Sequence, residues 1–261
     1  MLAGARLEAR RHGVRLLVSD AGDNDAIQAR HLDRFLEQEV NAIVVDPAGP
    51  GVVAATERAE EADVPVIAVG DVLPNQRVTT SVVSENIVAG RIAAEYLFFR
   101  MGGTGDAAEI LPSRLGPAGL EMQRGFLEIA DRTPTVTVVT RVTSPIGVGR
   151  APSVASRLFE SNPNLEGVFA GTDEIALSVV RAARRLGVLD RVVIVGVGGA
   201  PPTLAAIEAG RLEGSVRTDP AELGRVAVDA AVRAVRGERL PPRQFVDVTL
   251  VTHENVKRFL P

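Results

Sequence analysis

The sequence predicts an α/β protein with two similar lobes, each built from a parallel sheet flanked by helices. Short, Val-rich apolar runs, such as VVIVGV at 192–197, are typical of parallel strands that are buried on both faces. Segments with a single apolar stripe at helical spacing separate these runs. The alternation occurs in two successive series, over 14–83 and 107–218. Such alternation indicates right-handed βαβ units on parallel sheets.

The first series follows a helix over 4–12, which Gly13 is expected to close as a left-handed cap. The elements expected next, in order, are a strand over 14–19, a helix over 25–39, a strand over 42–46, a helix beginning near Pro50, strands over 64–69 and 78–83, and a helix over 86–100.

The second series begins with a strand over 107–111. It continues with a helix over 117–130, a strand over 136–140, a helix over 151–160, a strand over 168–171, a helix over 172–187, a strand over 191–199, a helix over 201–212 and a strand over 213–218. Asp219-Pro220 then predicts a helix start, because Asp caps helices and Pro fits the first turn. This helix is expected to end at Gly237, and a last strand is expected over 245–251.

The composition of the chain argues against several classes of function. The net charge is −4 and the basic residues are scattered, so an electrostatic footprint for nucleic acid is lacking. The chain has no cysteine, which excludes disulfides and thiolate chemistry. No apolar run is long enough to span a membrane. No catalytic constellation is evident, so we expect no enzyme and no cofactor.

Metal and nucleotide sites are not expected either. The three histidines, His12, His31 and His253, lie far apart, and we interpret them as surface or structural residues. The glycines at 196–199 follow a strand but lack the full G-x-G-x-x-G pattern of dinucleotide sites, which favours a tight turn.

Several long segments together resemble a known family. They are FLEQEVNAIVVDPAGPGVVAATERAEEADVPVIAVG, VVSENIVAGRIAAEYL, VFAGTDEIALSVVRAARRLG, VIVGVGGAPPTLAAIEAGRLEGSVRTDPAELG and VTLVTHENV. In order and content they are similar to type I solute-binding proteins, the ribose-, galactose- and allose-binding receptors of ABC importers. The sensor domains of LacI-type repressors are related to these receptors.

The resemblance implies two lobes joined by three crossovers, with a sugar-like solute clamped in the interlobe cleft by hinge closure. The lobes would comprise 1–84 with 219–245, and 85–218 with 246–261. The implied partner is the membrane permease of an ABC importer. A ligand-sensing domain of a LacI-type regulator and a degenerate homologue that binds nothing remain as alternatives.

The implied location is the periplasm or the cell surface. The opening MLAGARLEARRHG has no apolar region or cleavage site of a signal peptide, so the chain as written would stay in the cytoplasm. The family also has a strand before the helix that matches 4–12, lying between the strands that match 14–19 and 42–46. We expect that strand to be absent here, either because the chain is a piece of a longer product or because the lobe closes the gap another way.

The resemblance also implies the ligand-binding positions. They are Gly70, Asp71, Ile146, Thr172, Asp173, Val197, Gly198 and Thr218. The family carries an Asp-Arg pair where this chain has Gly70-Asp71, and an aromatic residue where it has Ile146. It carries Asn in place of Thr172, Phe-Asp in place of Val197-Gly198, Gln in place of Thr218, and Arg near Leu120.

These departures remove most groups that bind sugar hydroxyls. We therefore expect weak or no binding of ribose, glucose and galactose, because a buried hydroxyl without a partner costs about 1–3 kcal/mol. Thr172 and Asp173 could contact a ligand, or they could cap the helix that follows them. Asp71 could contact a ligand or be a solvated turn residue. Arg114 and Arg150 could hold an anionic ligand or lie on the surface as ordinary arginines.

Overall fold

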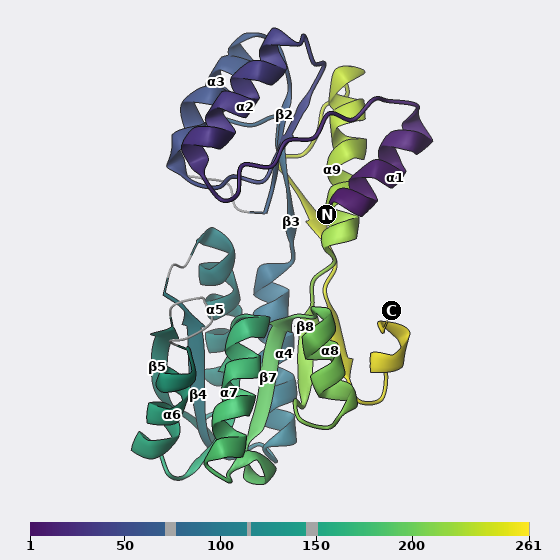
Figure 1. Cartoon of the computed structure of the whole chain (residues 1–261). Coiled ribbons are helices and arrows are strands. Elements are labelled where there is room, and N and C mark those ends of the chain that lie inside the picture. The colour runs from purple at the N-terminus through teal and green to yellow at the C-terminus, as the bar shows by residue number, and fades with distance from the viewer. Residues whose placement is uncertain (71–76, 114–115, 145–150, 261) are drawn as a thin grey trace. The chain divides into compact units, whose positions relative to one another are not determined.

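The computed structural model describes residues 1–70, 77–113, 116–144 and 151–260 (Figure 1). The chain folds into two compact units, and it passes from one to the other three times. Unit 1 comprises residues 1–85 and 219–247, and unit 2 comprises residues 86–218 and 248–261. Each unit is an α/β layer structure, as the alternation of strands and helices predicts.

Unit 1 is built on a parallel sheet of four strands in the order β1-β2-β3-β9. Its elements are α1 (Leu2–His12), α2 (Asp25–Glu37), β1 (Ile43–Val45), η1 (Pro50–Val52), α3 (Val53–Glu61), β2 (Val66–Val69), β3 (Thr80–Ser84), α9 (Pro220–Val235) and β9 (Arg243–Val246). The helix expected over 4–12 is present as α1, and Gly13 closes it in the left-handed conformation with φ +67°.

Both faces of this sheet are covered. Val66 packs with β1, α2 and α3 on one face, whereas its neighbour Ile67 packs with α9 on the other. Successive residues of a strand point to opposite faces, so a strand covered on both sides is apolar at every position. β2 fits this rule, since all four of its residues are buried. This is why its sequence, VIAV, shows no polar alternation.

The strand expected over 14–19 is not formed, and this prediction is wrong. The segment leaves α1 as irregular chain and most of its residues are exposed, including Val14 and Val18. Its composition suits a strand, but a strand exists only where a neighbour completes its hydrogen bonds. Here the sheet ends at β1, which pairs with β2 alone among the described strands.

Unit 2 is built on a sheet of six strands in the order β10-β8-β7-β6-β4-β5. Its elements are α4 (Asn86–Arg100), β4 (Gly105–Pro112), α5 (Pro117–Ala130), β5 (Val136–Ser144), α6 (Ala151–Ser161), β6 (Leu165–Ala170), α7 (Asp173–Arg185), η2 (Leu189–Arg191), β7 (Val193–Gly198), α8 (Pro201–Glu208), β8 (Gly214–Arg217), β10 (Thr249–Thr252) and η3 (Val256–Arg258). All neighbouring strands are parallel except β10, which runs antiparallel to β8.

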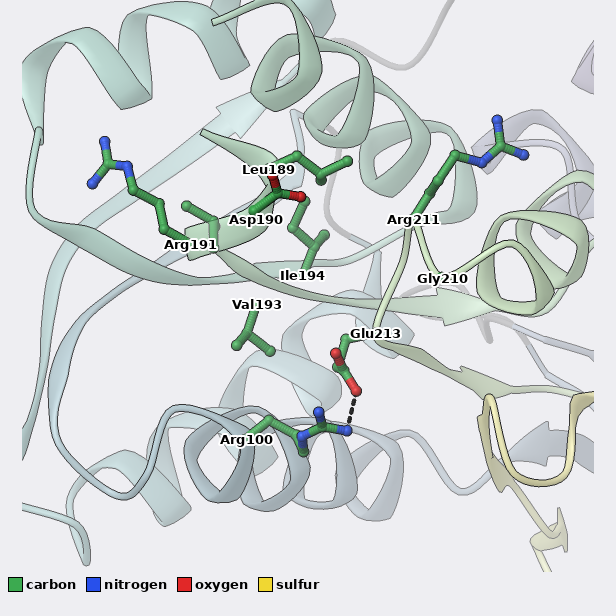
Figure 2. A pocket seen from close by; sticks show the side chains of 10 residues that line it. Arg100, Leu189, Asp190, Arg191, Val193, Ile194, Gly210, Arg211 and Glu213 are labelled. Carbon is green, nitrogen blue, oxygen red and sulfur yellow. Dashed lines mark ion pairs between the residues drawn. The ribbon is translucent and has the colours of Figure 1, made fainter. Parts of the chain in front are cut away.

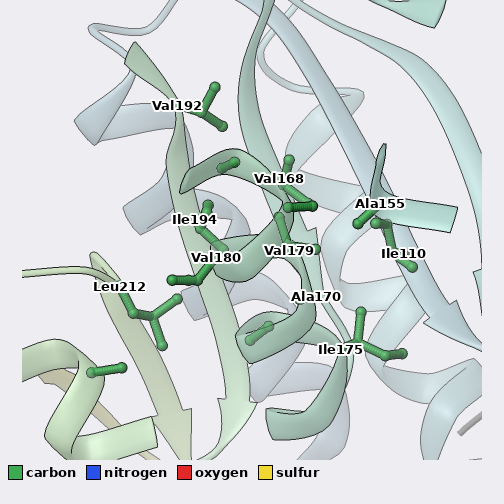
Figure 3. Packing of buried hydrophobic residues seen from close by; sticks show 14 of the residues in the cluster. Ile110, Ala155, Val168, Ala170, Ile175, Val179, Val180, Val192, Ile194 and Leu212 are labelled. Carbon is green, nitrogen blue, oxygen red and sulfur yellow. The ribbon is translucent and has the colours of Figure 1, made fainter. Parts of the chain in front are cut away.

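Helices cover both faces of this sheet as well. Figure 3 shows the face beneath α7, where Ile175 and Val179 pack onto Val168 and Ile194 of the central strands. The opposite face holds α4 and α5, and there Phe126 stacks on Phe169 with 4.7 Å between ring centroids. The residues 167–170 of β6 and 194–197 of β7 are therefore buried on both sides.

Several boundaries differ from expectation by two or more residues, and two of the differences change how the fold is interpreted. The strand predicted over 245–251 is divided: β9 ends at Val246 in the sheet of unit 1, and β10 begins at Thr249 in the sheet of unit 2. An apolar run cannot reveal that its two halves belong to different sheets. The helix predicted over 201–212 ends at Glu208, because Gly210 takes a left-handed conformation with φ +65°. Leu212 is nevertheless buried in the core.

Candidate functional site

The predicted ligand-binding residues of unit 2 lie in the loops after β6, β7 and β8. These strands are neighbours and parallel, so their carboxyl ends meet at one edge of the sheet. Thr172 and Asp173 follow β6, Val197 and Gly198 end β7, and Thr218 follows β8. Open α/β sheets bind ligands at this edge. The structure therefore brings these five positions together.

Asp173 connects two of these loops. Its carboxylate accepts hydrogen bonds from the backbone N–H groups of Gly199 (3.0 Å) and Ala200 (2.8 Å). Asp173 lies in the first turn of α7, and Ala200 is the N-cap of α8. The Asp173 carboxylate therefore also accepts hydrogen bonds from backbone N–H groups at the start of α8. Burial raises the pKa of the Asp173 carboxyl above its ordinary value, while these backbone N–H groups oppose that shift by stabilising the ionised form.

Gly198 allows this connection because it has no side chain. A Cβ at this position would lie 2.3 Å from Oδ2 of Asp173, and its φ of +134° is one that L-residues rarely adopt. The sequence predicts a tight turn over 196–199, but residues 196–198 belong to β7, and the positive φ of Gly198 and Gly199 marks where the chain leaves the strand close to the partly buried Asp173 carboxylate. The same geometry shows that both oxygens of Asp173 are already hydrogen-bonded.

The remaining predicted residues of this edge differ in what they can offer a ligand. Oγ1 of Thr172 accepts a hydrogen bond from the backbone N–H of Ile175 (3.3 Å) and so caps α7, but its own O–H remains able to donate. The Thr218 hydroxyl lies 3.5 Å from the carbonyl of Gly198, which leaves it weakly held. Val197 is 4% exposed and packs in the core, so it offers packing rather than a polar contact.

Sequence reasoning missed Arg217, the last residue of β8. Its side chain runs past Gly199, where a Cβ would lie 2.7 Å from Cγ of Arg217. Its guanidinium lies 5.4 Å from the centroid of the Phe259 ring, a cation–π distance. The sequence feature that could have identified it is its position directly before Thr218, where the resemblance places a crossover between the lobes. The cation–π contact places the charge of Arg217 against the Phe259 ring.

Unit 1 has a comparable edge of its own at the carboxyl ends of β1 and β2. Gly70 follows β2, has φ +75°, and donates its N–H to the carbonyl of Val82 (2.9 Å). The neighbouring loop after β1 is held by Gln28, whose amide donates to the carbonyl of Asp46 (2.8 Å) and accepts from the N–H of Ala48 (2.8 Å). Gln28 and Asp46 were not singled out from the sequence.

Four residues named from the sequence, Asp71, Ile146, Arg114 and Arg150, lie outside the described residues. Leu120, which takes the place of the family's arginine, lies on α5 and is 54% exposed. An exposed leucine cannot replace the bidentate contact that arginine makes to hydroxyl or carboxylate oxygens.

A pocket lies at the opposite edge of the unit 2 sheet, near the amino ends of β7 and β8 (Figure 2). Residues lining it include Arg100, Val193, Ile194, Arg211 and Glu213. Arg100 is paired with Glu213, and Figure 2 shows the Arg211 side chain directed away from this pair. The polar groups do not converge on a common point, so this pocket is a poorer candidate than the carboxyl-end loops.

The comparisons with known proteins decide the family. Residues 1–239 match the family described as periplasmic binding protein domain. The chain belongs to this family. The family assignment agrees with the resemblance found in the sequence, and the α/β architecture of both units agrees with it too.

Among curated members, the chain is 26% identical over 238 residues to the ribose import binding protein of Bacillus subtilis, covering 91% of this chain and 77% of that protein. It is 28% identical over 260 residues to the D-apiose import binding protein of Actinobacillus succinogenes, covering 98% of this chain and 84% of that protein. Both relatives are named as import binding proteins, not as enzymes.

Two solved structures of this family extend the comparison. An ABC transporter solute-binding protein from Bacillus halodurans with bound myo-inositol has a TM-score of 0.87 at 25% identity, covering 98% of this chain and 90% of that chain. One from Mycobacterium smegmatis with bound glycerol has a TM-score of 0.86 at 25% identity, covering 100% of this chain and 91% of that chain. No helix in the described part of the present chain is long and apolar enough to cross a membrane.

Proposed function

We propose that this periplasmic binding protein is the solute receptor of an ABC-type importer, and that it binds a small carbohydrate-like solute without converting it. The family match over residues 1–239 carries the proposal. The edge formed by β6, β7 and β8 supports it, because the Thr172 and Thr218 hydroxyls lie there in the loops on either side of the end of β7. By analogy with the relatives named for import, the receptor acts outside the cytoplasmic membrane and delivers its solute to a membrane permease.

The solute is smaller or less polar than an aldohexose. A hexose presents many hydroxyl groups, and each one buried without a partner costs about 1–3 kcal/mol. The described part of the proposed site offers two threonine hydroxyls, one of which also caps α7. Asp173 holds the start of α8 with both of its oxygens. Few hydroxyls can be satisfied by such a set, which favours small polyols and short sugars.

The proposal is tested by screening the purified chain for stabilisation by a library of pentoses, hexoses, inositols and small polyols, followed by calorimetry on each hit. We expect at least one small polyol or short sugar to bind. Binding of no member of the library would contradict the receptor function. Micromolar or tighter binding of ribose, glucose or galactose would contradict the proposed preference while leaving the receptor function intact.

The site itself is tested with Thr218→Val and a matched control, Thr252→Val. Thr218 leaves the carboxyl end of β8, whereas Thr252 ends β10 and pairs with Gly214 at the amino end of β8. Loss of one hydrogen bond to the solute is expected to weaken its binding about tenfold in the Thr218 variant, which corresponds to about 1.4 kcal/mol. The Thr252 variant should bind as the wild type does; equal weakening in both would contradict the assignment of the site.

A further inference from the structure

Three potential metal ligands meet where α1 packs against α9 in unit 1. Glu8 and His12 are four residues apart on α1 and therefore lie on the same side of that helix, and Asp229 comes from α9. Nε2 of His12 lies 3.2 Å from Oε1 of Glu8 and 3.2 Å from Oδ1 of Asp229. The three atoms all lie within 4.8 Å of one another.

We propose that Glu8, His12 and Asp229 form a binding site for a divalent transition-metal ion of the zinc type. Zinc binds histidine nitrogen and carboxylate oxygen at about 2.0–2.2 Å, which places tetrahedral ligand atoms about 3.3 Å apart. The two distances of 3.2 Å from His12 Nε2 match this spacing. Three protein ligands leave a fourth position for water.

The hydrogen bonding of His12 supports a cation at this point. The same ring nitrogen faces two carboxylate oxygens at equal distance. A single N–H on that nitrogen cannot point well at both oxygens, since hydrogen bonds weaken steeply as they bend. A metal ion bound by all three atoms accepts a lone pair from each of them, and no donor has to be shared.

Glu8 gives the site a second reason to hold a cation, because its side chain is only 2% exposed. A buried carboxylate needs a close positive charge. Arg225 approaches Oε2 of Glu8 only to 3.8 Å, while it donates hydrogen bonds of 2.8 and 2.6 Å to Glu222. Arg11 donates a long hydrogen bond of 3.4 Å to Oε1, but its side chain is 72% exposed. Neither arginine therefore satisfies Glu8 fully.

The charged groups around the cluster sum to a net negative charge. Arg233 lies 3.7 Å from Asp229, but its closer partner is Glu238 at 2.8 Å. Counting these partners, four carboxylates (Glu8, Glu222, Asp229, Glu238) face three guanidiniums (Arg11, Arg225, Arg233), which leaves one negative charge in excess. The net charge of these groups therefore attracts a dication.

The packing of the two helices holds the ligands in place before any metal binds. A Cβ on Gly4 would lie 1.8 Å from the carbonyl oxygen of Ala221, and a Cβ on Gly224 would lie 2.2 Å from that of Met1. The two glycines thus let the helix backbones touch, and Figure 1 shows α1 lying alongside α9. A metal ion would link helices from opposite ends of the sequence. The sequence could not show this site, because Asp229 is 217 residues from His12.

The experiment uses the whole chain, freed of metal with a chelator, and Zn²⁺ alone as the probe. Calorimetry is expected to give one Zn²⁺ per chain, and Zn²⁺ is expected to raise the melting temperature because it binds the folded state. His12→Gln and Asp229→Asn should each weaken Zn²⁺ binding at least tenfold. His31→Gln and His253→Gln, matched controls outside the cluster, should bind Zn²⁺ as the wild type does.

Further measurements keep the test decisive if a variant folds poorly. Co²⁺ bound to the wild type should give the visible absorption of a four-coordinate site, and Mg²⁺, which demands oxygen ligands in octahedral geometry, should not raise the melting temperature. Absence of Zn²⁺ binding, or equal binding by the wild type and both ligand variants, would overturn the proposal. The test requires no solute, so its result is independent of the receptor function.

Discussion

The carboxylate of Asp173 accepts a 2.8 Å hydrogen bond from the backbone N–H of Ala200. Asp173 lies in the first turn of α7 and Ala200 is the N-cap of α8, so one side chain fixes the starts of two consecutive helices. Both starts lie at the edge of the sheet where we place the solute. The geometry of the proposed site therefore depends on Asp173, whose hydrogen bonds hold the start of α8 against the start of α7.

Replacing Asp173 with Ala is expected to destabilise the protein by about 1–3 kcal/mol, because two backbone N–H groups lose their acceptor in a partly buried place. Asp190→Ala is the control, since Asp190 is exposed and such changes usually stay within about 0.5 kcal/mol. Urea denaturation of both variants provides the measurement. Equal stabilities of the two variants would show that the hydrogen bonds of Asp173 contribute nothing.

Gly198→Ala is expected to be more harmful than Gly210→Ala. Both glycines have positive φ, but a Cβ at 198 would lie 2.3 Å from Asp173, whereas a Cβ at 210 would meet nothing within 4 Å. The Gly210 change should cost about 1 kcal/mol, the usual penalty for a left-handed residue with a side chain. The Gly198 change should cost at least about 1 kcal/mol more, because the loop must also move. Thermal unfolding of the two variants measures the difference in stability. A lower melting temperature for Gly210→Ala than for Gly198→Ala would contradict the expectation.

Glu109 should make stability depend on pH. It lies on β4 with no exposed surface, its Oε2 accepts a 2.9 Å hydrogen bond from Gln123, and its Oε1 is buried without a hydrogen-bond partner among the described residues. Burial raises the pKa of this carboxyl, although Gln123 and Arg141 oppose the shift. At pH values between the ordinary glutamate pKa and the raised pKa of the folded protein, the folded state therefore holds a proton that the unfolded state has released.

This raised pKa fixes the sign of the effect. Stability should fall as the pH rises above the ordinary glutamate pKa, and the fall should end above the raised pKa of the folded state. Glu109→Gln resembles the protonated acid, so it should match the wild type at low pH and exceed it at neutral pH by on the order of 1 kcal/mol. Denaturant titrations at several pH values measure the difference. A constant difference across the pH range would contradict the assignment.

Amide exchange should be faster in β1 than in β7. β1 has three residues, pairs with β2 alone among the described strands, and leaves Val44 37% exposed. β7 lies between β6 and β8 with helices on both faces. Protection follows the cost of local opening, which is lowest for short edge strands. Hydrogen exchange followed by mass spectrometry measures both strands at once, and equal protection would show that the β1 edge is closed in solution.

The sequence by itself determined the α/β class and most elements of both units. It could do so because periodicity is a local property: the VVIVGV run marks β7, and Gly13 marks the end of α1. It also determined the family, since long segments keep their order over residues 1–239.

The tertiary structure decided what depends on a neighbour distant in sequence. Segment 14–19 has the composition of a strand but no ladder to join, and the run 245–251 is shared between two sheets. Asp173 caps α8 because β6 and β7 lie side by side, and His12 meets Asp229 because α1 packs on α9. Hydrogen bonds and metal ligation act over a few ångströms of space, so the spacing of residues along the chain does not reveal them.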